Sequence, residues 1–379
     1  MKRFVKESGI PQASVAVKII DLKDGNVAAS HNASTPLIPA SIMKSVTTAS
    51  LLGETGCDWR YHTRVYTDGP IDLGIMKGNL IIEGSGDPSL NSAYEPYGED
   101  IVEEIVAALQ YMLITGIDGN ILIDETSFKG KSRPDSWMAG DFKKYYGTGS
   151  HGFNFMNNAS GDFSVENPGK IFTEKLLSRL GEEDIVVVGK EYKEGIKTQI
   201  LDHVSPPIDE IMRSCMMRSD NLFAESMLRT CGKLKGEDGS TDSAAKTEFE
   251  HWTSKKMPIE GVVIVDGSGL SRDNRMTADF MGAVLQEMSG DVNYASFFPL
   301  AGQEGTLKKF LAGTSLDSYI AMKTGSMKGI QCYAGYKLDD DYMPTHVVVI
   351  IMNNLTNNRD KAKKAAEKML LDIFNETEI

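Results

Sequence analysis

The segment Pro39-Ala40-Ser41-Ile42-Met43-Lys44 opens a run, residues 40–54, in which apolar residues recur at helical spacing. Three residues are close to one helical turn, so Lys44 can reach the Ser41 hydroxyl. A serine hydroxyl is a weak nucleophile until a base takes its proton, and a lysine with a lowered pKa can be that base. The unpaired N–H groups of a first helical turn would also stabilise developing negative charge. We expect Ser41 to be a nucleophile and Lys44 its base.

This pattern alone is not specific, because Ser243-Ala244-Ala245-Lys246 has the same spacing. A second element is Ser219-Asp220-Asn221. Ser219 can pass a proton to a leaving amine, and Asn221 offers both a donor and an acceptor to a peptide bond. The Ser-x-Asn pattern also recurs at Ser89-Leu90-Asn91, so this element is equally weak when taken alone.

The third element, Lys323-Thr324-Gly325-Ser326, ends a β-rich run that begins at Tyr319. We expect Lys323 to supply a positive charge, and Thr324 and Ser326 to supply hydroxyl donors, to a substrate carboxylate. Gly325 would let another segment of backbone approach the strand closely. Together, the three elements in this order are far more specific than any one of them.

This motif set resembles that of the penicillin-recognising serine enzymes. The surrounding residues resemble the D-alanyl-D-alanine carboxypeptidases/endopeptidases of the low-molecular-mass class C penicillin-binding proteins, which carry a large insert between the first two motifs. The matching segments are residues 39–44, 83–90, 203–207, 219–225, 266–271, 300–307 and 323–326. Ser243 follows the asparagine motif, in the wrong order, and Ser89 belongs to the Gly-Asp-Pro match in the insert.

The resemblance implies a mechanism and a substrate, the peptidoglycan stem peptide. Ser41 would attack the penultimate D-alanine carbonyl, with the oxyanion held by the N–H groups of Ser41 and Ser326. Ser219 would help protonate the departing D-alanine and Asn221 would hold the substrate amide. Lys323, Thr324 and Ser326 would hold the terminal carboxylate. In residues 137–147, which resemble a further family stretch, Asp141 would face the amine of a diaminopimelate side chain.

The expected fold is α/β (α+β), with an antiparallel sheet flanked by helices and an inserted second domain. Hairpin strands are expected at 15–22 and 27–30, helices at 208–231, 276–288 and 306–311, strands at 319–323, 332–338 and 346–352, and a last helix at 359–374. We assign residues 1–60 and 200–379 to a catalytic domain that resembles transpeptidases. Residues 61–199, with short strands and Gly-rich turns, form the insert.

Composition restricts the partners. A formal charge of −13 opposes binding to nucleic acid or to an anionic bilayer. No run of about 18 apolar residues is present, so we expect no membrane span. The cysteines show no metal spacing, and we expect neither metal nor cofactor. Free thiols are favoured, with a Cys215–Cys231 bridge left open. The charged start lacks a signal core, which indicates either a cytosolic protein or a mature exported chain.

Two rival functions remain open. A β-lactamase shares the acylation apparatus, but the commonest serine type needs a Glu-x-x-x-Asn loop, and none of the glutamates from Glu225 to Glu304 has Asn four residues on. The other rival is a non-hydrolytic β-lactam or cell-wall sensor, which need not keep both Lys44 and Lys323. The resemblance favours the enzyme, acylated by β-lactams, and implies a periplasmic or cell-envelope location.

Overall fold

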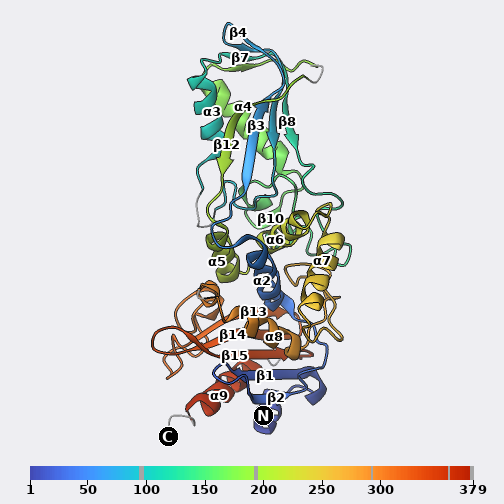
Figure 1. Ribbon diagram of the computed structural model, residues 1–379, viewed down its shortest axis with the longest axis vertical. Coiled ribbons are helices and arrows are strands. Elements are labelled where there is room, and N and C mark those ends of the chain that lie inside the picture. The colour runs from blue at the N-terminus through green and yellow to red at the C-terminus, as the bar shows by residue number, and fades with distance from the viewer. Residues whose placement is uncertain (94–97, 192–194, 292, 357–358, 376–379) are drawn as a thin grey trace.

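The computed structural model describes residues 1–93, 98–191, 195–291, 293–356 and 359–375. One end of the molecule is built on an antiparallel sheet of five strands in the order β13-β14-β15-β1-β2 (Figure 1). These strands are β1 (Val15–Asp21), β2 (Val27–His31), β13 (Ile320–Met327), β14 (Ile330–Leu338) and β15 (Pro344–Met352). β1 pairs with β15 along its whole length, so segments from the two ends of the chain meet in one sheet. The predicted fold class is confirmed.

Helices cover both faces of this sheet, because its central strands are apolar on both sides. In β15, Val347, Val349 and Ile351 face the core shared with α2 (Met43–Thr55) and α8 (Ala278–Met288). The alternate residues Val348, Ile350 and Met352 face α1 (Lys2–Ser8) and α9 (Arg359–Asn375). The period of two along a strand therefore divides β15 between two cores.

A helical layer lies beyond α2 and contains α5 (Ile208–Arg218), α6 (Asn221–Leu234) and α7 (Thr241–Ser254) (Figure 1). The predicted continuous helix at 208–231 is wrong, because Ser219 takes a left-handed φ of 61° and ends α5. Asp220 then caps α6, its carboxylate accepting from Phe223 N at 3.0 Å. The predicted helix at 306–311 is also wrong: a 3-10 turn covers Gly305–Leu307, and Leu311 takes a left-handed φ of 55°.

The insert projects from this body, away from the end that carries the termini (Figure 1). Its described residues form two four-stranded sheets, one short hairpin and two α-helices. Their bounds are β3 (His62–Thr67), β4 (Ile71–Asp72), β5 (Ile75–Met76), β6 (Leu80–Glu83), β7 (Gly116–Ile117), β8 (Ile121–Asp124), β9 (Ala159–Ser160), β10 (Phe163–Ser164), β11 (Val186–Val187), β12 (Thr198–Val204), α3 (Ile101–Tyr111) and α4 (Pro168–Glu182). β12 pairs with β3 as far as Val204, so we propose that the insert, predicted as 61–199, continues to that residue.

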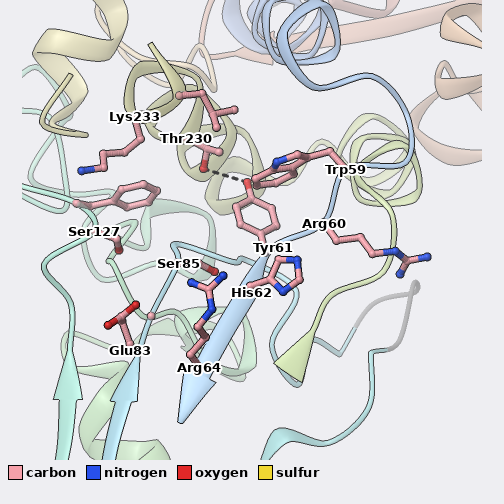
Figure 2. A pocket seen from close by; sticks show the side chains of 13 residues that line it. Trp59, Arg60, Tyr61, His62, Arg64, Glu83, Ser85, Ser127, Thr230 and Lys233 are labelled. Atoms are coloured by element: carbon pink, nitrogen blue, oxygen red, sulfur yellow. Dashed lines mark hydrogen bonds between the residues drawn. The ribbon is translucent and has the colours of Figure 1, made fainter. Parts of the chain in front are cut away.

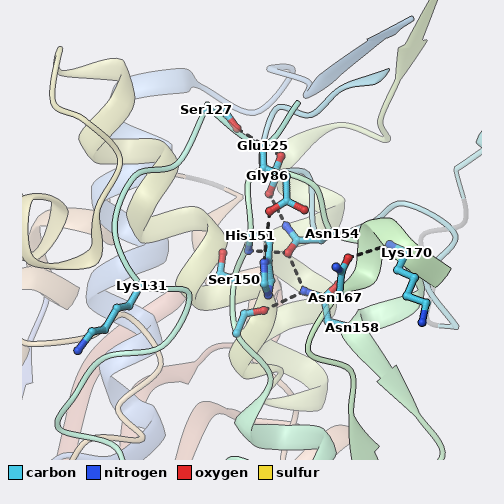
Figure 3. Close-up of polar contacts among 12 residues, drawn as sticks. Gly86, Glu125, Ser127, Lys131, Ser150, His151, Asn154, Asn158, Asn167 and Lys170 are labelled. Atoms are coloured by element: carbon cyan, nitrogen blue, oxygen red, sulfur yellow. Dashed lines mark hydrogen bonds and ion pairs between the residues drawn. The ribbon is translucent and has the colours of Figure 1, made fainter. Parts of the chain in front are cut away.

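Part of the insert packs against α6 through a polar network. Ser150 Oγ lies 2.9 Å from Ser226 Oγ of α6. Figure 3 shows the interior of this segment, where Asn154 Oδ1 accepts from His151 N at 2.9 Å and from Asn158 Nδ2 at 2.7 Å. The network fixes the loop before it, which reaches the cavity described below.

Arg229 of α6 anchors the same segment. Its guanidinium is buried and donates to the carbonyls of Gly239 and Lys129 at 2.7 Å and of Ser150 at 2.5 Å. It also lies 4.6 Å from the centre of the Phe128 ring. Five donors in a rigid plane suit such a set of buried carbonyls, so one side chain fastens three loop segments to α6.

All four cysteines lie in the described part of the chain and are free thiols, which decides against the Cys215–Cys231 bridge. Among the described residues, no helix combines the length and the apolar character needed to cross a bilayer.

We expect Arg229→Met to lower the free energy of unfolding by about 3 kcal/mol or more, since it leaves buried carbonyls without donors. The measurement is urea denaturation followed by circular dichroism. The control is Lys246→Met, because Lys246 is exposed and its ion pair with Glu250 is exposed as well. Its effect should stay within about 0.5 kcal/mol. Equal effects of the two substitutions would contradict the anchoring role.

Candidate active site

Ser41 lies in a 3-10 turn, Ala40–Ile42, that runs directly into α2. The sequence predicted an α-helical first turn here, and the structure winds it more tightly. Ala40 has a left-handed φ of 49°, and its carbonyl lies against Gly269, where a Cβ atom would come within 2.0 Å of that oxygen. The turn thus depends on a glycine distant in sequence, and it presents the Ser41 side chain to a cavity.

Lys44 is fully buried, and its ammonium meets three oxygen atoms from three different elements. Nζ donates to Ser41 Oγ at 3.1 Å, to Asn221 Oδ1 at 2.7 Å and to the Ser268 carbonyl at 2.7 Å. A protonated amine has three N–H donors, so this set satisfies it completely. A neutral amine keeps two donors for Asn221 and Ser268, which leaves its lone pair directed at the Ser41 hydroxyl.

Burial lowers the pKa of Lys44, although nearby carboxylates, including Glu225, partly oppose the shift. Burial also lowers the pKa of Lys323 well below its usual range, and the Lys44 cation adds to that effect. Repulsion between the two ammonium groups makes it unfavourable for both lysines to be charged at the same time. The site therefore favours a state in which one of them is a neutral base.

Asn221 stands at the start of α6 and bridges the two parts of the molecule. Its Oδ1 accepts from Lys44, and its Nδ2 donates to the Tyr146 carbonyl of the insert at 2.7 Å. These two contacts fix the orientation of the amide and leave one N–H of Nδ2 for a ligand. Ser219, just before α6, lines the cavity beside it.

The motif from Lys323 to Ser326 lies within β13 rather than at its end, because the strand continues to Met327. β13 is the edge strand next to the Ser41 turn. At Gly325 a Cβ atom would lie 2.6 Å from the Pro39 carbonyl and 3.1 Å from Ser41 N, so only glycine permits this approach. The Ser41 turn therefore packs directly on the strand that carries Ser326.

Two other members of this motif have internal partners. Lys323 is buried, and its Nζ donates to the Thr324 carbonyl at 2.9 Å. Thr324 Oγ1 donates to Thr306 Oγ1 at 2.8 Å. Neither Lys323 nor Thr324 is among the described residues that line the cavity discussed next.

A cavity of about 1300 Å³ brings most of the predicted residues together. Ser41, Asp141, Ser219, Asn221 and Ser326 line it. Lys44 lies behind Ser41, and Asp141 accepts from Tyr146 Oη at 3.0 Å. Ser243, which has the same Ser-x-x-Lys spacing as Ser41, lies elsewhere, on α7. Its hydroxyl donates to Glu237 at 2.6 Å.

Several groups of this site carry no motif in the sequence and were not predicted. Arg218, Arg272 and Arg359 also line the cavity, and they give it a positive wall in a chain of net charge −13. Such a wall suits a substrate with carboxylates. The carbonyls of Ser268 and Tyr146 were missed because a backbone group gives no residue-type signal. Ser268 does fall in a segment, 266–271, that the sequence analysis had singled out without a role.

A second cavity, of about 330 Å³, lies at the other end of α6 (Figure 2). Trp59, Phe128 and Leu234 give it an apolar wall, and Lys233 lies at its side. Tyr61 Oη and Thr230 Oγ1 meet behind it at 3.1 Å. None of the predicted site residues lines this cavity, so the chemistry points to the larger one.

The chain is similar to known proteins both in sequence and in fold. A family described as the D-Ala-D-Ala carboxypeptidase 3 (S13) family matches residues 1–161 and 154–373. The chain is 27% identical over 343 residues to carboxypeptidase DacB of Mycolicibacterium smegmatis, covering 85% of this chain and 73% of that protein. Its fold is similar to penicillin binding protein 4 of Haemophilus influenzae, with a TM-score of 0.84, 19% identity and coverage of 99% and 98%. It is also similar to a predatory endopeptidase of Bdellovibrio bacteriovorus, with a TM-score of 0.62, 17% identity and coverage of 96% and 93%.

We expect Gly325→Ala to lower the free energy of unfolding by roughly 1–3 kcal/mol, because the added methyl group forces β13 away from the Ser41 turn. Gly53→Ala is the control, since Gly53 lies in α2 with open space at its Cβ position. That change should stabilise the protein by about 0.5–1 kcal/mol. Urea denaturation measures both. A neutral Gly325→Ala substitution would contradict the close packing.

Proposed function

This chain belongs to the D-Ala-D-Ala carboxypeptidase 3 (S13) family, and we propose that Ser41 is its acyl-accepting nucleophile and Lys44 the base. The family membership makes it a serine D-Ala-D-Ala peptidase that acts on peptidoglycan. The assignment of its residues rests on one observation above all. Lys44 Nζ lies 3.1 Å from Ser41 Oγ, held there by Asn221 and the Ser268 carbonyl.

Acylation begins when neutral Lys44 accepts the Ser41 proton as Oγ attacks the carbonyl carbon of the penultimate D-alanine. The resulting oxyanion accepts from the N–H groups of Ser41 and Ser326, which the packing at Gly325 holds in place. Loss of one such donor costs roughly 3 kcal/mol of transition-state stabilisation. The C–N bond then breaks, and Ser219 relays the proton from Lys44 to the departing amine.

The terminal carboxylate of the substrate also influences which of the two buried lysines is neutral. We assign its binding to Lys323, Thr324 and Ser326, next to the arginine wall of the cavity. A carboxylate near Lys323 favours the charged form of that lysine. A charged Lys323 in turn disfavours charge on Lys44, so the arriving carboxylate favours the neutral base.

The acyl group then leaves Ser41 by hydrolysis. Water attacks the ester carbonyl, Lys44 accepts its proton, and Ser41 Oγ recovers a proton as the C–O bond breaks. A β-lactam enters the same first step, since its amide carbonyl and carboxylate match those of the peptide. Its ring-opened amine stays attached to the acyl group, so we expect hydrolysis to be slow and the adduct to accumulate.

Asp141 is our candidate for recognising the stem-peptide side chain. It lines the cavity and accepts from Tyr146 Oη, while the carbonyl of Tyr146 binds Asn221. A carboxylate at that position suits the free amine of a diaminopimelate residue. Because peptidoglycan is the substrate, we also propose a periplasmic or cell-envelope location.

The two rival functions make different predictions for turnover. A β-lactamase would release the opened lactam rapidly, and a sensor would acylate without releasing D-alanine from a peptide. Lys44 contacts both Ser41 and Asn221 beside the cavity, and Lys323 lies on β13 together with Ser326; this arrangement supports the peptidase.

We expect a fluorescent penicillin to form one adduct on the wild-type chain, none on Ser41→Ala, and a normal adduct on Ser243→Ala. Intact mass and gel fluorescence measure the adduct. Release of D-alanine from a D-Ala-D-Ala peptide should be lost in Ser41→Ala alone. An adduct that survives Ser41→Ala would refute the assignment of the nucleophile.

We expect Asp141→Asn to raise KM about tenfold or more for a stem peptide whose side-chain amine is free, because an amide replaces the charged partner. The same peptide with an acetylated amine should be processed equally by wild type and variant. Asp135→Asn is the control, since Asp135 is exposed and pairs with Lys131. An equal loss on both peptides would reject amine recognition by Asp141.

A further inference from the structure

Glu225 is a buried carboxylate of α6 that has no part in the mechanism given above. Its Oε1 accepts from Ser268 N at 2.8 Å. The carbonyl of the same residue, Ser268, accepts from Lys44 Nζ at 2.7 Å. Glu225 and Lys44 therefore bind the two backbone groups of a single residue, and Glu225 acts on Lys44 through that residue.

The turn that carries Ser268 is held from several sides. Asp266 accepts from Gly269 N at 2.8 Å and from Ser271 N at 2.6 Å. Thr47 of α2 donates to the Gly267 carbonyl at 2.9 Å. A Cβ atom at Gly267 would lie 2.8 Å from the Ala224 carbonyl, so the turn packs directly on α6. A turn held in this way transmits a change at Glu225 to Lys44.

The charge of Glu225 has few partners of its own. Its Oε2 is buried and has no hydrogen-bond partner among the described residues. The charged or titratable groups around it are Lys44 of α2, Cys215 of α5, Arg229 of α6, Glu248 of α7 and Asp266 of the turn. Burial, with the charge of Asp266, raises the pKa of Glu225 to about 7.

We propose that Glu225 is a positioning residue for Lys44. Through Ser268 it holds the carbonyl that aims the Lys44 amine at Ser41, and its negative charge stabilises the ammonium formed when Lys44 takes the serine proton. This inference rests on the proposed roles of Ser41 and Lys44. It explains why the buried carboxylate of Glu225 lies close to the proposed base, Lys44.

The test is the second-order rate of acylation by a fluorescent penicillin, measured from pH 5 to 10. Glu225→Gln keeps an oxygen for Ser268 N but removes the charge. We expect it to slow acylation roughly tenfold to a hundredfold, the effect of losing one charge-assisted interaction. Loss of the negative charge also lowers the pKa of Lys44, so the rise of the rate with pH should move to lower pH.

Two variants separate charge from packing. Glu248→Gln alters another buried glutamate of this region. Burial raises the pKa of Glu248 to about 8, so below that pH it is mainly protonated, and in that part of the pH range the variant should acylate like wild type. Thr47→Val removes a hydrogen bond to the turn without a change of charge. It should slow acylation and leave the pH midpoint unchanged.

Each outcome decides the question. A Glu225→Gln variant with the wild-type rate and midpoint overturns the proposal. A slower variant whose midpoint does not move overturns the role of the charge. If Glu225→Gln does not fold, Thr47→Val is the variant to measure. Acylation of Thr47→Val at the wild-type rate would reject positioning of Lys44 by the turn. If the wild-type chain itself forms no adduct on Ser41, the proposed function has failed instead.

Discussion

The buried amine of Lys44 is the constraint around which the rest of the site is arranged. A buried amine needs acceptors for each of its N–H groups, and they come from the Ser41 turn, from Asn221 at the start of α6, and from the Ser268 carbonyl. These segments are far apart in the sequence, so the catalytic contacts form only when α2, α6 and the turn after α7 have packed together. The same burial that needs these partners also lowers the pKa of the amine and makes it a base.

The insert contributes hydrogen bonds that help to fix the groups around Lys44. The Tyr146 carbonyl accepts from Asn221, and Trp137 Nε1 donates to Asp266 at 2.8 Å. Asp266 in turn shapes the turn that holds Ser268. The loop that carries Asp141 is thus fastened at one end to Asn221, which contacts Lys44 directly, and at the other to the turn that holds Ser268. Recognition of the substrate side chain and orientation of the base share one set of hydrogen bonds.

The sequence predicted the antiparallel sheet and its flanking helices, because apolar periodicity is a local signal. The three motifs are also local, and they supplied the candidate site residues. It did not predict the break at Ser219, since a left-handed serine between two helical patterns depends on tertiary contacts. It predicted a helix over 306–311, whereas the chain forms a short 3-10 turn there and Leu311 takes a left-handed φ. The carbonyls of Ser268 and Tyr146, and the link from Glu225 to Lys44, arise only when distant segments meet.

The central claim, that a neutral Lys44 takes the proton of Ser41, is tested most directly by the pH dependence of acylation in the unmodified chain. The rate of acylation by a β-lactam should rise as pH increases and level off, with a midpoint below the value near 10.4 of an exposed lysine, since burial lowers the pKa of this one. A midpoint near that of an exposed lysine, or a rate that does not change with pH, would contradict the account.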